Sequence, residues 1–350
     1  MIILAVESSC DETAVALVRD GRTVLADCIA SSVEMHRIYG GVVPEIASRK
    51  HIEVIAQLAD QALEQAGLSR GDIDAVAVTY APGLIGAVLV GVSFAKSVAY
   101  ALGVPLIPVH HVRGHIAANY LAHPDLEPPF VCLCVSGGTS LLVDVKGYTE
   151  MEILGATRDD AAGECFDKIA RVMGLGYPGG APLDRAAQGG NDKAFSLPRV
   201  HIQDAPLDMS FSGLKTAMLN LIHNAQQKGE ELPVADLAAS FSAAVSEELV
   251  PRTMAAAQAK GYGKVAVVGG VAANSRIRRD LEQACQAAGC TLYLPPLKLC
   301  GDNGSMIGSQ GYYEYLAGTR AGTDLNAYAN REISRPYGTG TAPVFPSPVE

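Results

Sequence analysis

The chain has 350 residues, which is more than a single hydrophobic core usually holds, so its length predicts two domains. Hydrophobic residues make up 49% and charged residues only 18%, which excludes an intrinsically disordered chain. The 27 Lys and Arg against 37 Asp and Glu give a net charge of −10, which excludes a global basic field for a polyanion such as RNA. Any RNA contact must therefore be local or shared with partners.

The eight cysteines include no CxxC pair, so reduced cytosolic thiols are the simpler interpretation. The N-terminal MIILAVESSC lacks a basic segment, which argues against a signal peptide and predicts a cytoplasmic protein. The apolar stretch 84–109 is nearly long enough to span a bilayer, but it contains Lys96 and is interrupted by Gly103 and Pro105. It predicts a buried helix followed by a strand, and no membrane association.

The first part of the chain predicts strands and then alternating helices and strands. Apolar patterns indicate strands over 2–7, 14–18 and 23–30, around a polar turn at 8–13. An amphipathic helix is expected over 51–66. The remaining elements are a strand (74–80), a helix (84–102), a strand (105–110) and a helix (111–121). The order is βββαβαβα.

The same order begins again at residue 130, which indicates an internal repeat. Strands are expected at 130–135, 141–145 and near 152, before a helix from 159 and an inserted region of roughly 60 residues. The repeat ends with a helix (234–260), a strand (264–268), a helix (275–288), a strand (291–294) and a helix (303–316). This pattern predicts an α/β protein with two tandem ribonuclease-H-like lobes of the actin-like ATPase fold. Each lobe should offer its first hairpin turn to a nucleotide.

The predicted domain limits follow from this repeat. Residues 1–115, joined by 303–330 returning to them, form the N-terminal lobe, and 116–302 form the C-terminal lobe with the nucleotide and substrate site. The segment 335–350 is a Pro- and Gly-rich tail without periodicity.

His111 and His115 stand four residues apart at the start of a predicted helix, so both imidazoles should lie on one face, within reach of one cation. Such a pair is more often structural, but these two follow a strand whose carboxyl end is where α/β proteins bind ligands. The residues between them include no glutamate, so the metalloprotease motif HExxH is absent.

A third ligand is offered by Asp302, in a glycine-flanked turn before the last helix. The commoner role of an Asp there is to cap the helix. Nitrogen and oxygen ligands with open positions suit iron or zinc as a Lewis acid, and the spacing does not choose between them.

Three glycine pairs follow strands or precede helices in the second half: Gly137-Gly138, Gly179-Gly180 and Gly269-Gly270. Each could let the backbone approach a phosphate or adenosine, although a glycine pair is usually only turn chemistry. No GxxxxGK[ST] pattern is present, so the chain is not a P-loop enzyme.

Polar side chains near these glycines are candidates for binding ribose hydroxyls. Asp167, with Asp160 and Glu164, is either a ligand-binding residue or part of a solvated helix face. Asp184 and Asn274 could act in the same way. The segments 40–51 and 210–216 are candidate substrate-facing loops, because they combine small residues with isolated charges.

These segments together resemble the TsaD family of tRNA N6-adenosine threonylcarbamoyltransferases, over about residues 1–320. The segments that carry the resemblance are ESSCDET (7–13), GGVVPEIASRKH (40–51), APGLIGAVLVG (81–91), PVHHVRGH (108–115), VSGGT (135–139), DDAAGECFDK (159–168), YPGG (177–180), SFSGLKT (210–216), GGVAANSRIR (269–278) and CGDNGSMIG (300–308).

The resemblance implies a cytosolic enzyme that moves the threonylcarbamoyl group of threonylcarbamoyl-adenylate onto N6 of adenosine 37 in tRNAs reading ANN codons, with release of AMP. It implies one iron ion per subunit, with zinc as the alternative, held by His111, His115 and Asp302. ATP or the adenylate would be the nucleotide ligand, and TsaB-like and TsaE-like proteins would be partners. The residues implied in binding the substrate or nucleotide are Cys134, Val135, Ser136, Gly137, Gly138, Asp167, Gly180, Asp184 and Asn274.

The chain departs from its relatives at Thr139, where they commonly have a histidine, so a side-chain donor beside that turn is missing. Glu12, in the first hairpin turn, is a candidate for proton handling, with a turn-forming role as the alternative. The rival function is an actin-like small-molecule kinase, which would share the fold but needs carboxylate-bound Mg²⁺ instead of histidine ligands. A non-catalytic scaffold would be expected to lack HHxxGH.

Overall fold

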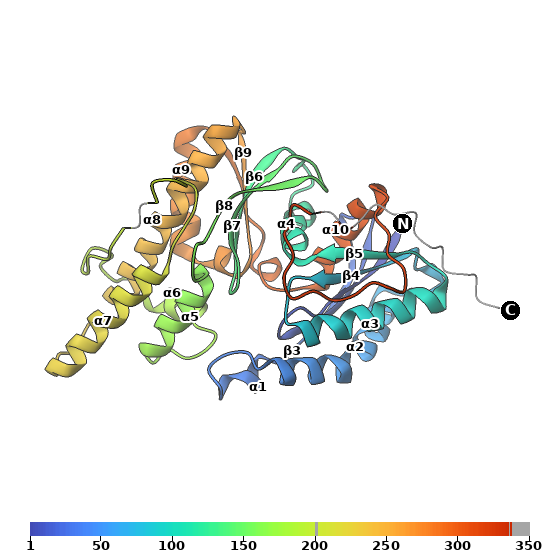
Figure 1. Ribbon diagram of the computed structural model, residues 1–350, viewed down its shortest axis with the longest axis horizontal. Coiled ribbons are helices and arrows are strands. Elements are labelled where there is room, and N and C mark those ends of the chain that lie inside the picture. Colours follow the sequence, from blue (N-terminus) through green and yellow to red (C-terminus); the bar gives the residue numbers. More distant parts are fainter. Residues whose placement is uncertain (200–201, 336, 338–350) are drawn as a thin grey trace. The chain divides into compact units, whose positions relative to one another are not determined.

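The computed structural model describes residues 1–199, 202–335 and 337 (Figure 1). The chain forms two compact units. The first unit contains Met1–Pro128, Gly147–Met151 and the described residues from Gly301 onward, and the second contains Pro129–Lys146 and Glu152–Cys300.

The division between the units differs from the predicted one. The predicted boundary after residue 115 falls inside helix α4 (His111–Ala122), which belongs wholly to the first unit because it packs against α10 (Gly304–Leu316). Asp302, predicted for the second lobe, lies in the first unit with the two histidines. Apart from Arg335 and Tyr337, the predicted tail lies outside the described residues.

The first unit is built on a five-stranded sheet of β1 (Ile2–Glu7), β2 (Glu12–Arg19), β3 (Thr23–Ser31), β4 (Ala75–Ala81) and β5 (Leu106–His110). The strand order is β3-β2-β1-β4-β5. The first three strands form an antiparallel meander, and β4 and β5 continue the sheet in parallel with β1. This confirms the predicted order of elements.

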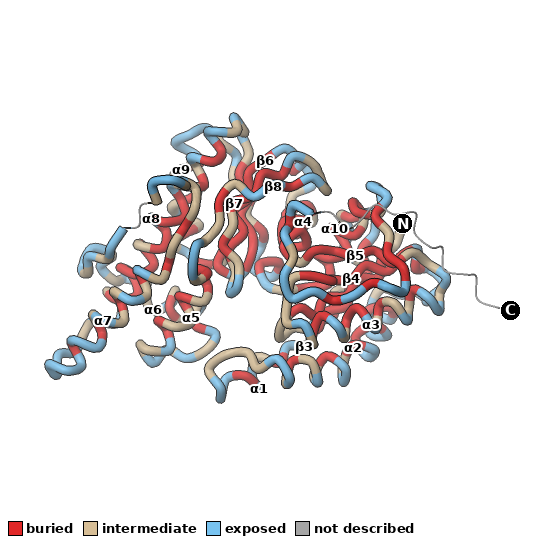
Figure 2. Tube along the Cα trace, in the orientation of Figure 1, coloured by how far each residue is buried: buried red, intermediate tan, exposed pale blue. Residues whose placement is uncertain are grey.

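Helices cover both faces of this sheet, so its strands are apolar on both sides (Figure 2). Helices α2 (Pro44–Ala66) and α3 (Ile85–Leu102) pack on one face, whose side chains are large, such as Leu4, Leu17 and Val76. Helix α10 packs on the other face, whose side chains include Ala5, Ala16 and Ala77.

The close packing of α10 on the sheet depends on three of its glycines. A Cβ atom at Gly304, Gly308 or Gly311 would lie 2.7, 2.5 or 2.6 Å from its nearest neighbour on β2 or β4. Real Cβ atoms do not approach that closely, so a larger residue here would push the helix away from the sheet.

Two segments predicted as substrate-facing loops are largely helical. Helix α2 begins at Pro44. Proline suits a first helical position because its φ is already helical and an amide proton there would have no partner within the helix. The helix therefore takes up most of 40–51. A short helix, α1 (Val33–Arg37), precedes it. Helix α7 (Ser212–Lys228) similarly takes up most of 210–216.

Helix α3 is long and apolar enough to cross a membrane, and it is the only such helix among the described residues. Its buried residues Ala87, Val88, Gly91, Val92, Ala95 and Ala99 recur at three- and four-residue spacing. That face packs on β4 and α2, as expected for a helix that covers a sheet with one of its faces.

The second unit repeats the arrangement of the first. Its sheet contains β6 (Phe130–Val135), β7 (Ser140–Val145), β8 (Met151–Ala156), β9 (Lys264–Val268) and β10 (Thr291–Tyr293), in the order β10-β9-β6-β7-β8. Again the first two strands, β6 and β7, are antiparallel, and β9 and β10 continue the sheet in parallel with β6. The predicted internal repeat is therefore confirmed.

The helices of the second unit are α5 (Ala162–Val172), α6 (Gly180–Ala186), α7, α8 (Val234–Lys260) and α9 (Ser275–Ala288). Short 3₁₀ turns occur at Arg70–Asp72 in the first unit and at Gly270–Ala273 and Leu297–Leu299 in the second. The apolar core lies between the sheet and helices α5, α7, α8 and α9.

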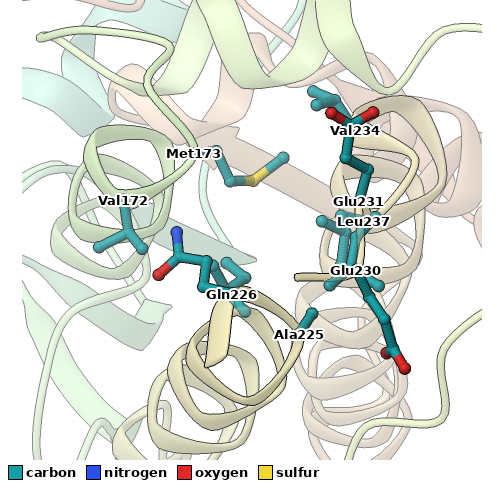
Figure 3. Close-up of a pocket in the computed structure, with 10 residues that line it drawn as sticks. Val172, Met173, Ala225, Gln226, Glu230, Glu231, Val234 and Leu237 are labelled. Atoms are coloured by element: carbon teal, nitrogen blue, oxygen red, sulfur yellow. The ribbon is translucent and has the colours of Figure 1, made fainter. Parts of the chain in front are cut away.

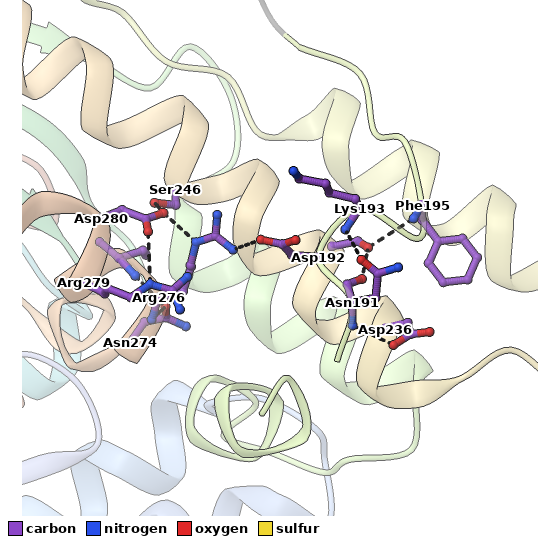
Figure 4. A network of polar contacts seen from close by, with 12 residues as sticks. Asn191, Asp192, Lys193, Phe195, Asp236, Ser246, Asn274, Arg276, Arg279 and Asp280 are labelled. Atoms are coloured by element: carbon purple, nitrogen blue, oxygen red, sulfur yellow. Dashed lines mark hydrogen bonds and ion pairs between the residues drawn. The ribbon is translucent and has the colours of Figure 1, made fainter. Parts of the chain in front are cut away.

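Asn191 and Asp192, in the inserted region after α6, form polar contacts with α8 and α9 (Figure 4). Asp236 on α8 accepts a hydrogen bond from the Asn191 amide at 2.8 Å. On α9, Arg276 forms an ion pair with Asp192 of the inserted region and a second one with Asp280 on its own helix. These contacts order a segment that has no regular secondary structure.

Candidate functional site

His111, His115 and Asp302 come together as predicted. The ligand atoms of the three side chains lie within 4.8 Å of one another. Nε2 of His111 is 3.5 Å from Oδ1 of Asp302, and Nε2 of His115 is 3.2 Å from the same oxygen. The imidazoles occupy the first and fifth positions of α4, so they share one helix face, with ring centroids 4.6 Å apart.

Asp302 is not the cap of the last helix. Asn303 has that role, because its side-chain oxygen accepts the Met306 amide at 2.8 Å. The adjoining amides of Gly304 and Ser305 donate to the carboxylate of Asp27 on β3. The carboxylate of Asp302 is therefore left to face the histidines.

His110, which directly precedes the pair, has a structural role instead. Its Nδ1 accepts the Val112 amide at 3.2 Å, and its Nε2 donates to the Arg331 carbonyl at 3.0 Å. Burial lowers the pKa of His110 to about 3, so the ring is neutral. A neutral ring satisfies both of these hydrogen bonds.

Gly114 lets α4 approach α10 closely, since a Cβ atom there would lie 2.6 Å from Cδ1 of Ile307. That approach brings the histidines of α4 near Asp302, which directly precedes the capping residue of α10.

A buried carboxylate supports His111 from behind. Glu7, the last residue of β1, is fully buried, and its Oε2 lies 3.1 Å from Nδ1 of His111. The Ser9 amide donates to Oε1 of Glu7 at 2.6 Å, and the Thr79 hydroxyl donates to Oε2. The hydroxyl of Ser9 also lies 3.1 Å from Nδ1 of His111.

The charges of the cluster are strongly coupled. Burial alone would lower the pKa of His111, but the carboxylates of Glu7 and Asp302 outweigh it and raise this pKa to about 9. Burial alone would raise the pKa of Asp302, but His111 and His115 bring it to about 2. The site therefore favours positive charge between ionised carboxylates.

The donor set fits a divalent metal ion. Both nitrogens of the buried His115 lack a hydrogen-bond partner, because the approach of Nε2 to Asp302 does not have hydrogen-bond geometry. An unpartnered buried imidazole costs free energy, and coordination of a cation by one of its nitrogens would remove part of that cost. Two nitrogens and one oxygen suit iron or zinc. Among the described residues this is the only such cluster.

Glu12 lies in the same unit, at the start of β2, where Ser31 donates a hydrogen bond to it at 3.0 Å. Burial, reinforced by the negative charges of Asp11 and Asp302, raises its pKa to about 9. Glu12 is thus a neutral acid at pH 7 in the metal-free protein, and it can donate a proton or a hydrogen bond.

The polar residues predicted to bind substrate in the second unit hold helix termini. Oδ1 of Asp167 accepts the Gly179 amide at 2.6 Å, just before α6. Asp184 accepts both the amide and the hydroxyl of Ser275, and Asn274 caps the same helix, α9. These contacts fix the first turns of α6 and α9.

The glycines of the predicted nucleotide site fall into two groups. Gly179 and Gly269 are needed for packing, since a Cβ atom at these positions would lie 2.5 and 2.3 Å from neighbouring atoms. A Cβ atom at Gly137, Gly138, Gly180 or Gly270 would meet nothing within 4 Å. These four leave room for a ligand to approach the backbone.

The two residues before the turn at 136–139 can offer a ligand only their backbone groups. Cys134 and Val135 end β6 with buried side chains, and Sγ of Cys134 lies 3.8 Å from Sγ of Cys132. The turn is closed by the Ser136 amide, which donates to the Thr139 carbonyl at 2.8 Å.

A separate cavity of about 370 Å³ lies in the second unit, between the end of α5, the end of α7 and the start of α8 (Figure 3). Its wall is mainly apolar, with Glu230 and Glu231 at one side. None of the residues predicted for substrate or nucleotide binding lines it.

Sequence reasoning did not assign a role to Glu7. The available signal was a single charged residue at the end of an otherwise apolar strand, IILAVE, within the motif ESSCDET. A charge that ends a buried strand has to find a partner, but the partner is distant in sequence and only the fold reveals it.

Comparison with known proteins identifies relatives along nearly the whole chain. The family model of TsaD, tRNA N6-adenosine threonylcarbamoyltransferase, matches residues 23–309. A protein of that name from Moorella thermoacetica is 55% identical over 325 residues, which cover 93% of this chain and 95% of the relative. Another, from Clostridium botulinum (strain 657 / Type Ba4), is 52% identical over 331 residues, covering 95% and 97%.

Solved structures support the fold. HypF from T. kodakarensis matches with a TM-score of 0.62 and 17% identity, over 91% of this chain and 48% of that chain. Component A of the (R)-2-hydroxyglutaryl-CoA dehydratase of Acidaminococcus fermentans matches with a TM-score of 0.52 and 15% identity, over 90% and 99%. With the repeated sheets, these matches confirm two lobes of the actin-like ATPase fold. The chain belongs to the TsaD family of tRNA N6-adenosine threonylcarbamoyltransferases.

Proposed function

We propose that this chain transfers the threonylcarbamoyl group of threonylcarbamoyl-adenylate to N6 of adenosine 37 in tRNAs that read ANN codons, releasing AMP. The observation that supports it most strongly is 55% identity, over 93% of the chain, to a protein named as this transferase. The kinase alternative is weaker, because the relatives are named as threonylcarbamoyltransferases and two of the three clustered side chains are histidines.

The reaction is demanding because the lone pair of the adenine amine is delocalised into the ring. We further propose that His111, His115 and Asp302 hold one iron or zinc ion, supported by their geometry and by the unpartnered nitrogens of His115. Such an ion would supply Lewis-acid polarisation and orientation of an acyl oxygen.

In this scheme Glu12 handles a proton. Its raised pKa makes it a proton donor in the metal-free protein, and a nearby cation would favour its ionised form. A carboxylate poised between these two states suits general acid–base work at neutral pH.

The nucleotide part of the donor would bind the second unit. Gly137, Gly138 and Gly180 have open space above their backbones, and the amides of glycine turns and helix N-termini are suited to phosphate. Asp167, Asp184 and Asn274 hold the helices that carry or adjoin these turns. These three side chains would position the backbone amides that face the ligand, as well as bind its ribose.

We also propose TsaB-like and TsaE-like partner proteins and a cytoplasmic location. The family resemblance is the main support for the partners, and an acidic chain that lacks a general basic field fits shared tRNA binding. All eight cysteines are free thiols, which fits a reducing compartment.

The experiment is transfer of labelled threonylcarbamoyl from its adenylate to unmodified tRNA, with the partner proteins present. Wild-type protein is compared with His111→Ala and with His123→Ala, a control at the end of the same helix. We expect modified adenosine from the wild type and the control but not from His111→Ala. Equal activity of all three would refute the metal site, and phosphorylated products without modified tRNA would favour the kinase alternative.

The role of Glu12 is tested in the same assay with Glu12→Gln. We expect a fall of about 10²- to 10⁴-fold in the transfer rate, because the amide cannot exchange a proton. An unchanged rate would leave Glu12 only its hydrogen bond to Ser31.

A further inference from the structure

Three parallel strands of the first unit end beside the proposed metal ligands His111, His115 and Asp302. Glu7 is the last residue of β1, Thr79 lies near the end of β4, and His111 directly follows β5. These strands are neighbours in the sheet, so their carboxyl ends meet at one edge. The three side chains form a continuous row of hydrogen-bonding groups there.

We infer that Glu7 is a positioning residue, which accepts the Nδ1 proton of His111 and so presents the Nε2 lone pair to the metal ion. This inference rests on the proposed metal site. Its geometric basis is that Nδ1 of His111 is 3.1 Å from Glu7, whereas Nε2 faces Asp302 on the opposite side of the ring. Histidine ligands commonly donate their second nitrogen to a carboxylate, which fixes both tautomer and ring orientation.

The surroundings of Glu7 make it an acceptor only. Its side chain has no exposure to water, and the Ser9 amide and the Thr79 hydroxyl already donate to its two oxygens. A carboxylate held by two donors does not rotate away, so the imidazole that faces it is fixed as well. Each donor that reaches the carboxylate offsets part of the cost of burying its charge, and His111 is the third donor after Ser9 and Thr79.

Replacement of Glu7 by glutamine makes a specific prediction about His111. The Ser9 backbone amide can only donate, so the glutamine oxygen must stay beside it and the NH₂ group must face His111. His111 would then accept at Nδ1 and carry its proton on Nε2, the atom that must coordinate the metal. The substitution therefore conserves the shape of the side chain at position 7 but inverts the tautomer of His111.

The test is a titration of the full-length, metal-free protein with Co²⁺, followed by visible absorption, which reports affinity and ligand geometry together. We expect Glu7→Gln to bind Co²⁺ about 10- to 100-fold more weakly than the wild type, with an altered spectrum. His111→Ala serves as the ligand-deletion control.

Ser9→Ala is the matched control for the hydroxyl that also lies near Nδ1 of His111. Alanine keeps the backbone amide that holds Glu7, so the carboxylate should stay in place. We therefore expect this variant to bind Co²⁺ within about threefold of the wild type, because larger losses are typical of removing the carboxylate that orients a histidine ligand.

Each result decides something different. Equal affinity and spectrum for Glu7→Gln and wild type would overturn the inference while leaving the metal site intact. A loss in Ser9→Ala but not in Glu7→Gln would assign the positioning role to Ser9. Absence of Co²⁺ binding by wild-type protein would overturn both the metal site and the inference.

A second measurement needs no variant and therefore does not depend on the folding of Glu7→Gln. In wild-type protein loaded with Zn²⁺, the ¹⁵N–¹H spectrum of the imidazoles should show the proton of His111 on Nδ1, protected from exchange with water. A proton on Nε2 instead would overturn the inference.

Discussion

At the scale of single residues, burial and charge attraction oppose each other in the cluster of His111, His115 and Asp302. Burial disfavours charge on His111 and Asp302, the attraction between them restores it, and His115 is left without a hydrogen-bond partner. In the metal-free protein the imidazolium of His111 supplies the positive charge that the surrounding carboxylates require. A bound cation would replace it.

This replacement predicts a pH dependence of metal affinity. The pKa of His111 is raised to about 9, so below that pH a proton must leave before the ring can coordinate a metal. Asp302 has its pKa lowered to about 2 and stays ionised throughout. We expect the apparent affinity for Zn²⁺ to rise about tenfold per pH unit from about pH 7 to 9, and then to level off.

The measurement is a competition titration with a chelator of known affinity at several pH values. The matching calorimetric observation is release of about one proton per metal ion bound at about pH 7.5, obtained from buffers of different ionisation enthalpy. An affinity that does not change over this pH range would contradict this account of His111.

At the scale of helices and strands, glycine decides how near α10 lies to its sheet. We expect Gly308→Ala to destabilise the protein by about 1–3 kcal/mol, because the new methyl group would lie 2.5 Å from Val18. Gly213, near the start of α7, is the matched control, since nothing lies within 4 Å of a Cβ atom there. Gly213→Ala should be neutral or stabilising by up to about 1 kcal/mol.

Both variants are compared with the wild type by chemical unfolding. Equal stability of the two alanine variants would mean that α10 adjusts without cost. Because Asp302 directly precedes the cap of α10, we expect Gly308→Ala also to weaken metal binding, whereas Gly213→Ala, in the other unit, should not.

At the scale of the whole molecule, net charge sets an expectation for RNA binding. The chain has ten more acidic than basic residues (37 − 27 = 10), so general electrostatic attraction for tRNA is weak. We expect the isolated chain to bind tRNA at about 0.15 M salt with a Kd no tighter than the nonspecific range of about 10⁻⁶ to 10⁻⁴ M.

Fluorescence anisotropy with labelled tRNA checks this, with the partner proteins added in a second series. We expect the partners to tighten binding. Nanomolar binding by the chain alone, with little dependence on salt, would show that a local surface is sufficient and would remove this argument for shared recognition.

The sequence by itself determined the order of elements, the internal repeat and the shared helix face of His111 and His115. Periodicity reports elements reliably when they are long and apolar, as in β1, α3 and α8, and the i, i+4 spacing of His111 and His115 fixes their shared face within one helix. Motifs of the chain identified the family. Helix starts were less predictable. The small and charged residues over 40–51 predicted a loop, but a helix begins at Pro44.

The tertiary structure alone decided which distant residues meet. The unit boundary lies after Pro128 instead of residue 115 because α4 packs against α10, a contact that no local pattern encodes. The same packing brings Asp302 to the histidines and leaves capping to Asn303. Glu7 faces His111 because parallel strands bring residues far apart in sequence to one sheet edge, where burial requires each charge to find a partner.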